Sequence, residues 1–490
     1  MCPLNVRSLY FLVAFAVALI VTPGHAATQD DAQVILTPAA LEEDLAEFQS
    51  ELEARWAYLE ANGVDLTAAI ERVRVGAGED GISVQALGIE LEKIIALFID
   101  GHAGVRNADY PGAYLPLLVS LSGDRLVAYR EDRRSLVDPD HPYLIEIDGL
   151  SVEEWLRVAQ VFHPTGSAQY RRRQGARMLR KLQFLRGKLQ RPLTPTAVVV
   201  LSDEGGTSTA AHTVDISSSQ PEYGTWPMKG SALLPGDIGY LRISAMRDWQ
   251  AGEIDRWMNH FRDADGLIVD VRGNGGGSRD ALRALFPYLM GEDDRPWVMN
   301  IGKFRLHEDR EPHHMTRRFM YAADSVHWAA AERESIDEFM ASWQPEWVPP
   351  AGKFSVWHFM VMSRRINPGS YHFDRPVVVL LDYSCFSATD IFVSAFKGWP
   401  KVTLVGTPSG GGSALSETFE LSNSHLRIRH ASMASFQRSG RLHDGNGTEP
   451  DYRVEPAPDF FLKHGHDNQL DLALELIKGG EKSTTAEGSN

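Results

Sequence analysis

The chain has 490 residues, of which 43% are hydrophobic and 23% are charged, as in ordinary folded domains. By the usual size of domains, this length accommodates about two to four of them. The formal net charge of −16 and the pI near 5.5 argue against nucleic acid as a general partner, because nucleic-acid-binding surfaces are basic.

The N-terminus has the pattern of a cleavable secretory signal peptide. A basic residue precedes an apolar run, Leu9–Val21, that is too short to cross a bilayer, and small residues then predict cleavage after Ala26. A retained membrane anchor is the alternative for the same run. We expect residues 1–26 to be removed and the mature protein to be secreted, in the periplasm. Cys2 would leave with this segment, so that Cys385 has no partner for an intramolecular disulfide.

The region from residue 27 to 108 is predicted to be helical. Residues 36–62, 66–75 and 84–98 repeat apolar side chains at helical spacing. They predict an N-terminal helical cap. His102 follows the last of these helices and precedes a predicted strand. A histidine in such a loop is usually structural or exposed, so the local pattern alone assigns it no role.

Residues 109–215 resemble a diverged PDZ-like module. Short predicted strands end in an Ile-x-Gly-type hairpin at Ile147–Gly149, a helix follows, and a last strand returns at 197–202. A PDZ groove can bind a peptide as an added strand. The usual carboxylate-binding loop is not recognisable here.

The segment 171–188 is strongly basic within an otherwise acidic protein. A helix of this kind could bind a carboxylate or a membrane surface. The plainer interpretation is a solvated face whose basic side chains pair with acidic neighbours.

Residues 203–235 predict a turn-rich connector or hairpin, and the core is expected to begin near Ile238. From there, strands and helices alternate in a βαβ rhythm. The apolar strand at 266–271 ends in a glycine loop, Gly273–Gly277. Glycines allow close backbone approach, and such a loop can present N–H groups to an anion. It lacks the Lys-Ser/Thr of a phosphate loop.

The aromatic-rich segment 297–373 predicts a lid or a wall of a substrate site, or a packed helical hairpin. A short helix is expected at 335–343. His313 and His314 are adjacent, and no third ligand follows at a suitable spacing, so we predict no metal and no other cofactor.

A second buried strand, Val377–Leu381, leads into hydroxyl-bearing residues and then a helix. The helix N-terminus offers free N–H groups that suit the developing oxyanion of an attacked carbonyl. Ser384, Ser387 and Thr389 are the hydroxyl residues at this junction. The alternative is that they only cap the helix.

These motifs together resemble the C-terminal processing (tail-specific) peptidase family. The glycine loop, written Asp-Val-Arg-Gly-Asn-Gly-Gly-Gly from Asp270, matches one family motif, and Ser387-Ala-Thr-Asp-Ile matches the other. The resemblance covers about residues 234–476 and implies an α/β fold with a ClpP/crotonase-like core of βαβ units over 234–478, with an insertion at 297–373. It also implies that Ser387 is the nucleophile.

The base that the processing peptidases use is missing. Their lysine would fall after the second motif, yet no lysine lies between Lys401 and Lys463, which excludes the family's Ser/Lys dyad. The chain is therefore similar to the branch with the tricorn core and the interphotoreceptor retinoid-binding protein. That resemblance implies His102 as general base, oriented by Asp444, with Glu449 and Asp451 as alternatives.

The function implied is an exported serine peptidase that cleaves polypeptide substrates through Ser387, His102 and Asp444. Backbone N–H groups of Gly276 and Ala388 would form the oxyanion hole. Membrane contact is allowed but not required. The alternatives are a non-catalytic protein that binds peptides or apolar ligands, and an esterase that uses the same residues. The tail, 479–490, is predicted to be disordered.

Overall fold

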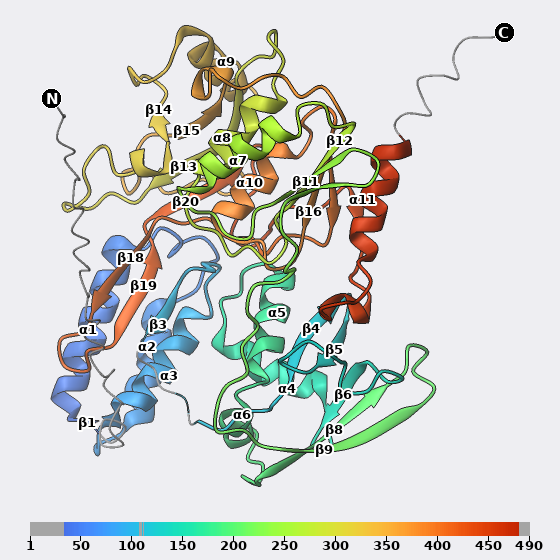
Figure 1. Cartoon of the computed structure of the whole chain (residues 1–490). Coiled ribbons are helices and arrows are strands. Elements are labelled where there is room, and N and C mark those ends of the chain that lie inside the picture. The colour runs from blue at the N-terminus through green and yellow to red at the C-terminus, as the bar shows by residue number, and fades with distance from the viewer. Residues whose placement is uncertain (1–33, 107–109, 111, 480–490) are drawn as a thin grey trace, which may run out of the picture.

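The computed structural model describes residues 34–106, 110 and 112–479. The predicted signal peptide, Cys2 and all but the first residue of the predicted tail lie outside the described residues. Helices and strands are arranged as a helical N-terminal region, a six-stranded sheet with its own helices, and a larger α/β body (Figure 1). Among the described residues, no helix combines the length and the apolar character that a membrane span requires.

Three helices form the N-terminal region, and each begins where a side chain caps it: α1 (Pro38–Arg55), α2 (Leu66–Ala77) and α3 (Val84–Ile95). The caps are Thr37, Asp65 and Ser83, whose side-chain oxygens accept N–H bonds of the first turn. Their apolar faces share one buried cluster with strands of the α/β body. Strands β1 (Ile35–Leu36) and β2 (Ile82–Ser83) pair beside them.

The region predicted to be PDZ-like contains an antiparallel sheet in the order β4-β5-β6-β8-β9, and β7 pairs with β6. These strands are β4 (Leu118–Ser122), β5 (Arg125–Tyr129), β6 (Tyr143–Ile147), β7 (Leu150–Ser151), β8 (Thr196–Ser202) and β9 (Thr209–Asp215). The basic segment forms α5 (Ala168–Met178) and α6 (Leu182–Lys188), which follow α4 (Val152–Ala159). Their apolar sides pack on the sheet in a separate cluster around Trp155.

The α/β body is built on a second sheet, in the order β10-β11-β12-β16-β17-β21. Its strands are β10 (Ala232–Leu234), β11 (Ile238–Arg242), β12 (Gly266–Asp270), β16 (Val377–Leu381), β17 (Val402–Gly406) and β21 (Tyr452–Arg453). All neighbours from β11 to β21 run parallel, as βαβ connections require. In register, Val269 of β12 lies beside Val379 of β16.

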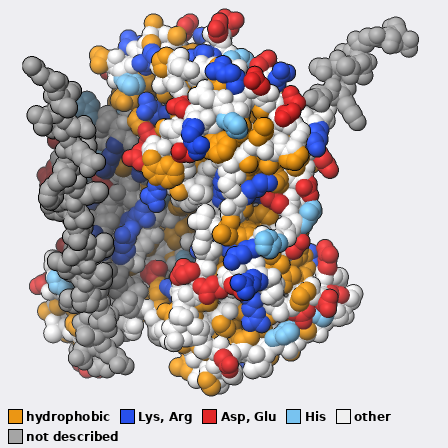
Figure 2. Space-filling view, viewed as in Figure 1, with side chains coloured by type: hydrophobic (Ala, Val, Ile, Leu, Met, Phe, Trp, Pro, Cys, Tyr) orange, Lys and Arg blue, Asp and Glu red, His pale blue; other side chains and the backbone are white. Residues whose placement is uncertain are grey.

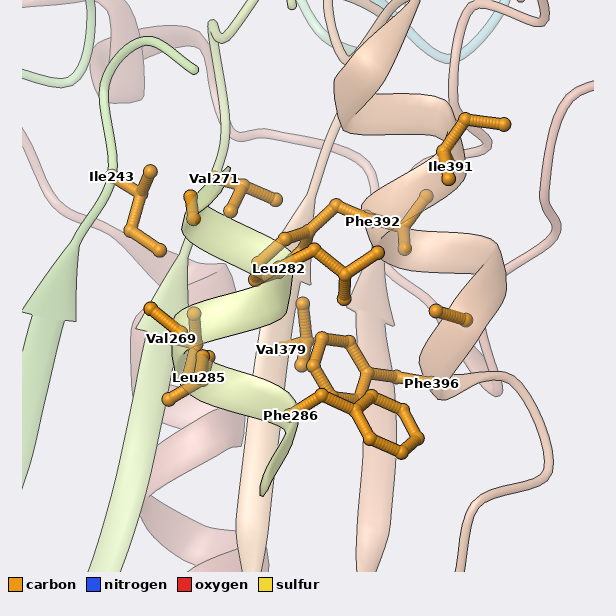
Figure 3. Packing of buried hydrophobic residues seen from close by; sticks show 14 of the residues in the cluster. Ile243, Val269, Val271, Leu282, Leu285, Phe286, Val379, Ile391, Phe392 and Phe396 are labelled. Atoms are coloured by element: carbon orange, nitrogen blue, oxygen red, sulfur yellow. The ribbon is translucent and has the colours of Figure 1, made fainter. Parts of the chain in front are cut away.

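Helices cover both faces of this sheet, which explains why its strands are apolar on both sides. On one face, α8 (Asp280–Leu285) and α10 (Ala388–Phe396) pack Leu282, Leu285 and Phe392 onto Val269 and Val379 (Figure 3). The helix α7 (Gln250–His260) lies on the same side. On the other face, α11 (Asn468–Gly479) buries Leu470 and Ile477 (Figure 1).

The aromatic segment 297–373 does not form the helical hairpin considered from the sequence. It contributes β13 (Trp297–Phe304), β14 (Tyr321–Ala322) and β15 (His358–Met362) to a sheet completed by β20 (Met433–Gln437). Its one α-helix is α9 (Ala330–Met340), which starts earlier than predicted because the Glu332 carboxylate accepts the N–H of Ala329. The segment is part of the body, since β13 pairs on both sides.

One short sheet joins the N-terminal region to the body. Strand β3 (Gly104–Arg106) pairs with β19 (Arg427–Ala431), which also pairs with β18 (Ser416–Glu420). This pairing holds the loop before β3 against the body. Charged side chains of both signs are spread over the face that Figure 2 displays.

Candidate active site

The site lies where the carboxyl ends of β12 and β16 meet, the edge at which open parallel sheets bind ligands. Ser387 follows β16 and precedes α10 with φ 61° and ψ −121°, an unusual backbone conformation for a residue other than glycine. Its side chain makes no hydrogen bond to the helix N-terminus. The hydroxyl of Ser387 is therefore not a helix cap. Strained backbone of this kind is typical of functional sites.

The glycine loop after β12 touches Ser387. A Cβ added to Gly276, at φ 103°, would lie 2.6 Å from the Ser387 Cβ and 3.0 Å from the Ala388 nitrogen, so a larger residue does not fit. The N–H of Ala388 is one of the orphan donors at the start of α10. The N–H of Gly276, by contrast, donates to Asn274 Oδ1 at 2.9 Å in this structure. Gly276 thus borders the serine, but its own donor is engaged.

His102 lies against the loop that carries Ser387, beside Phe386. Its ring packs on Phe386, with the ring centroids 4.6 Å apart, and its side chain is buried. Neither ring nitrogen has a hydrogen-bond partner among the described residues. Burial, together with the positive charges of Arg429 and Arg318, lowers the pKa of His102 to about 3. The imidazole is consequently neutral at ordinary pH.

Asp444 and a second acid, Asp100, meet at His102. One ligand atom from each of the three residues lies within 4.8 Å of the others. Asp444 accepts bonds from the N–H groups of Gly101 and Ser413, at 3.1 and 2.9 Å. Burial and the neighbouring Asp100 raise the pKa of the Asp444 carboxyl well above its usual value.

The two alternatives to Asp444 lie elsewhere. Asp451 is engaged by Lys397 Nζ at 2.5 Å and by the N–H of Leu404 at 2.8 Å, and Glu449 is exposed. Of the three acids considered from the sequence, Asp444 is the one that the structure brings to His102.

Asp100 is the site residue that the sequence reasoning missed. Its carboxylate accepts the N–H of His102 at 2.9 Å, and it also accepts the Trp56 indole N–H and the Ala431 N–H, both at 2.7 Å. Burial raises the pKa of Asp100. The available signal was an acid two positions before a histidine, which is common in turns and carries little information alone.

The acid pair is held by the N-terminal region. Tyr58 donates its hydroxyl to Asp444 at 2.9 Å, and Trp56 donates to Asp100. Both aromatic side chains are fully buried just beyond the end of α1. The first helix therefore positions two carboxylates that come from other parts of the chain.

A further buried acid, Asp390, lies in the first turn of α10. Its carboxylate accepts the Ser409 hydroxyl and the N–H groups of Gly411 and Gly412, at 3.2 and 3.1 Å. Burial raises its pKa to about 7. Asp390 thereby ties the helix behind Ser387 to the glycine-rich loop that also supplies the Ser413 N–H to Asp444.

The segment 297–373 also reaches the site, through Arg318. Its guanidinium donates to the carbonyl oxygens of Gly277 and Ala414, both at 3.2 Å, and so bridges the glycine loop and the loop before β18. No local sequence pattern indicates this contact, because the position of Arg318 depends on how the aromatic segment folds.

The three groups at His102 are close enough to share a metal ion. Their chemistry fits acid–base work better, because the oxygens of both carboxylates already accept hydrogen bonds from backbone or side-chain donors and two guanidinium groups lie nearby. The histidine pair, His313 and His314, does not join them.

Comparison with known proteins finds a matching family model and solved structures of similar fold. Residues 237–454 match the family model described as Peptidase family S41. The crystal structure of mature CPAF superimposes with a TM-score of 0.63 at 17% identity, over 92% of this chain and 98% of that chain. CPAF complexed with lactacystin gives 0.60 at 17% identity, over 91% and 98%.

A putative peptidase from Parabacteroides merdae has a TM-score of 0.46 at 15% identity, over 90% of this chain and 97% of that one. At these identities the two CPAF structures establish a shared fold. The segment that matches the family model contains Gly276, Ser387 and Asp444. Residues 237–454 are therefore similar to Peptidase family S41, and the chain is a serine-type peptidase.

Proposed function

We propose that this protein is an exported peptidase that hydrolyses peptide bonds in polypeptide substrates. Ser387 is the nucleophile, His102 the general base, and Asp444 the acid that orients the histidine. The observation that carries the proposal is the convergence at one sheet edge of a strained serine turn, a buried neutral imidazole and a buried acid pair. These are the three groups that a serine peptidase needs.

The chemistry follows from these positions. Ser387 Oγ attacks the substrate carbonyl carbon while His102 takes the hydroxyl proton. The C–N bond then breaks as the imidazolium returns that proton to the leaving amine, and water hydrolyses the resulting ester by the same steps. The Ala388 N–H and a donor of the glycine loop stabilise the oxyanion. For Gly276 to be that donor, its N–H must leave Asn274, to which it is bonded here.

His102 suits the role of base because it is neutral well below pH 7. Its ring nitrogens have no partner among the described residues, so the ring has to turn before it can bond both Ser387 and a carboxylate. An imidazolium that forms beside Asp444 favours the ionised acid, since opposite charges stabilise each other. Asp100, which holds the His102 backbone, positions the residue.

The branch without the catalytic lysine is part of the proposal. The loop after β17 contains no lysine, and Asp390 and the acid pair occupy its surroundings. A histidine base is the chemistry that these residues support.

The test uses a fluorophosphonate probe and fluorogenic peptides. The Ser387→Ala variant should lose labelling and peptide hydrolysis while it keeps its circular dichroism spectrum and melting temperature. Ser422→Ala, at an exposed serine, is the matched control and should keep both activities. Labelling or turnover that persists in Ser387→Ala would reject the assignment. Ester hydrolysis without peptide hydrolysis in the native enzyme would instead favour the esterase alternative.

Export, the helical cap and the PDZ-like character of residues 109–215 are also proposals. Export is supported by the apolar run at Leu9–Val21, and N-terminal sequencing of the secreted protein should begin at Ala27. The cap is supported by helices α1 to α3, and the PDZ-like module by its antiparallel sheet and the helix α4. Peptide binding as an added strand at the edge of this sheet would test the PDZ-like assignment.

A further inference from the structure

Two faces of the basic helix α5 differ in how their arginines are paired. Arg172 on the outer face binds Glu153 through two bonds, at 3.0 and 2.7 Å. Arg173 and Arg177, one turn apart on another face, have no carboxylate within ion-pair distance in the described part of the chain. Like charges at this spacing repel each other on a helix, so the inner pair costs stability as it stands.

These two arginines line a pair of adjoining cavities of about 60 and 90 Å³. The cavities lie between the antiparallel sheet of β4 to β9, the connector after β9 and the loops that follow β12 and β16. Residues shared by both cavities are Ser120, Arg173, Asp382, Ser384, Phe460 and Phe461. Arg133 and Arg177 line the larger one.

The cavities carry an excess of positive charge. Asp382 is the only acid among their lining residues, against three guanidinium groups. One oxygen of Asp382 already accepts the N–H groups of Gly273 and Ser384, at 3.0 and 2.9 Å. Arg177 lies over the Tyr223 ring at 4.0 Å. Burial and the nearby Arg177 lower the pKa of Arg173 to about 10, and Asp382 offsets this only in part.

We propose that these cavities bind one small oxyanion, a phosphate, sulfate or carboxylate group, between Arg173 and Arg177. Each cavity has room for about two or three water molecules, which suits a single oxyanion group. Guanidinium groups bind such anions through paired N–H donors. The hydroxyls of Ser120 and Ser384 can donate further bonds. The anion is either free in solution or the carboxylate at the end of a peptide chain.

The site adjoins the catalytic loop. Asp382 and Ser384 belong to the turn that ends at Ser387, so an anion that contacts Ser384 links α5 to the nucleophile. Binding should favour one arrangement of that turn, because a ligand stabilises the state that it contacts. This effect on hydrolysis rests on the proposed function, whereas binding itself does not.

The experiment measures binding in the full-length Ser387→Ala protein, so that the outcome is independent of catalysis. Calorimetry with inorganic phosphate, and separately sulfate, should give one saturable site. Arg173→Gln and Arg177→Gln should each weaken it at least about tenfold, as expected for the loss of a charge-assisted bond. Arg172→Gln, on the outer face, should change it less than about twofold. In anion-free buffer Arg173→Gln should melt at a higher temperature, because the repulsion is gone.

Two further arms separate the sources of the anion. A peptide with a free C-terminal carboxylate that competes with phosphate, and whose amide does not, identifies a chain end as the occupant. Phosphate binding without such competition identifies a free ion. Arg173→Lys, which keeps the charge, guards against misfolding and should bind with intermediate affinity. Absence of binding by every probe, or equal losses in Arg172→Gln and Arg173→Gln, would overturn the proposal.

Discussion

The two halves of the proposed catalytic site are built in different ways. The nucleophile half consists of Ser387 and the Gly273–Gly277 loop, which follow neighbouring strands of one parallel sheet. The acid–base half brings together His102, Asp100 and Asp444, which come from distant parts of the chain. Hydrogen bonds from Trp56 and Tyr58 hold the two carboxylates. A sheet edge fixes the first half locally. The second exists only when the N-terminal region packs on the body.

Removal of the proposed general base, His102, should have the largest effect. His102→Ala should lower kcat/KM by about 10⁴-fold or more, since members of such a catalytic set act together. The nucleophile half should stay folded, so the melting temperature should change little. Single-turnover kinetics with a fluorogenic peptide measures the effect. A loss below tenfold would mean that another group takes the proton.

Gly276→Ala tests the nucleophile half. The added methyl group would meet the Ser387 Cβ at 2.6 Å and the Phe386 carbonyl oxygen at 2.6 Å, so the serine turn must shift. We expect a fall in kcat on the order of a hundredfold or more, as for the loss of an oxyanion donor. Gly275→Ala is the control, because a Cβ there meets nothing within 4 Å. Equal kinetics for both variants would contradict the close contact.

Tyr58→Phe tests the acid–base half alone. It removes the hydroxyl that donates to Asp444, leaving a buried carboxylate with one partner fewer. The expected cost is about 1–3 kcal/mol of unfolding free energy, with a lower kcat and unchanged KM. Urea denaturation and steady-state kinetics measure the two effects. If the kinetics moved without any change in stability, the bond would matter to chemistry only.

Asp390 predicts how stability depends on pH. Its folded-state pKa of about 7 exceeds the value of about 3.9 expected when unfolded, so the folded protein holds a proton that the unfolded chain releases. Stability should therefore fall as the pH rises from about 4 to about 7. Asp390→Asn should remove only part of this dependence, because the pKa values of Asp100 and Asp444 are also raised in the folded protein. Thermal melts across this range would show an unchanged slope if Asp390 were ionised throughout.

The smallest expected effect sharpens the electrostatics around His102. Of the charges that lower the pKa of His102, Arg429 has the largest effect. Arg429→Gln should raise that pKa and move the acid limb of kcat/KM to higher pH. Arg427→Gln, on the same strand and exposed, should leave the limb in place. Identical profiles for the two variants would show that this charge does not reach the base.

The sequence predicted the nucleophile half more fully than the acid–base half, for physical reasons. Strand β16, the serine turn and the glycine loop are local patterns whose geometry follows from strand and helix periodicity. Asp100 and Arg318 gain their positions from packing between distant segments, which no local pattern encodes. For the aromatic segment the sequence predicts a lid, a wall of a substrate site or a helical hairpin. The strand β13 pairs with β15 and β20, which lie far along the chain, and no local pattern encodes that pairing.

The contacts of Trp56 and Tyr58 with the acid pair have a consequence for the order of synthesis. The ribosome makes the imidazole early and the serine and Asp444 late, so the emerging polypeptide has no working centre until almost its whole length exists. Under the export that we propose, a chain in transit would therefore be unable to cleave the machinery that carries it. On this proposal, peptidase activity arises only when the N-terminal helices, which are synthesised first, pack against the C-terminal turns, which are synthesised last.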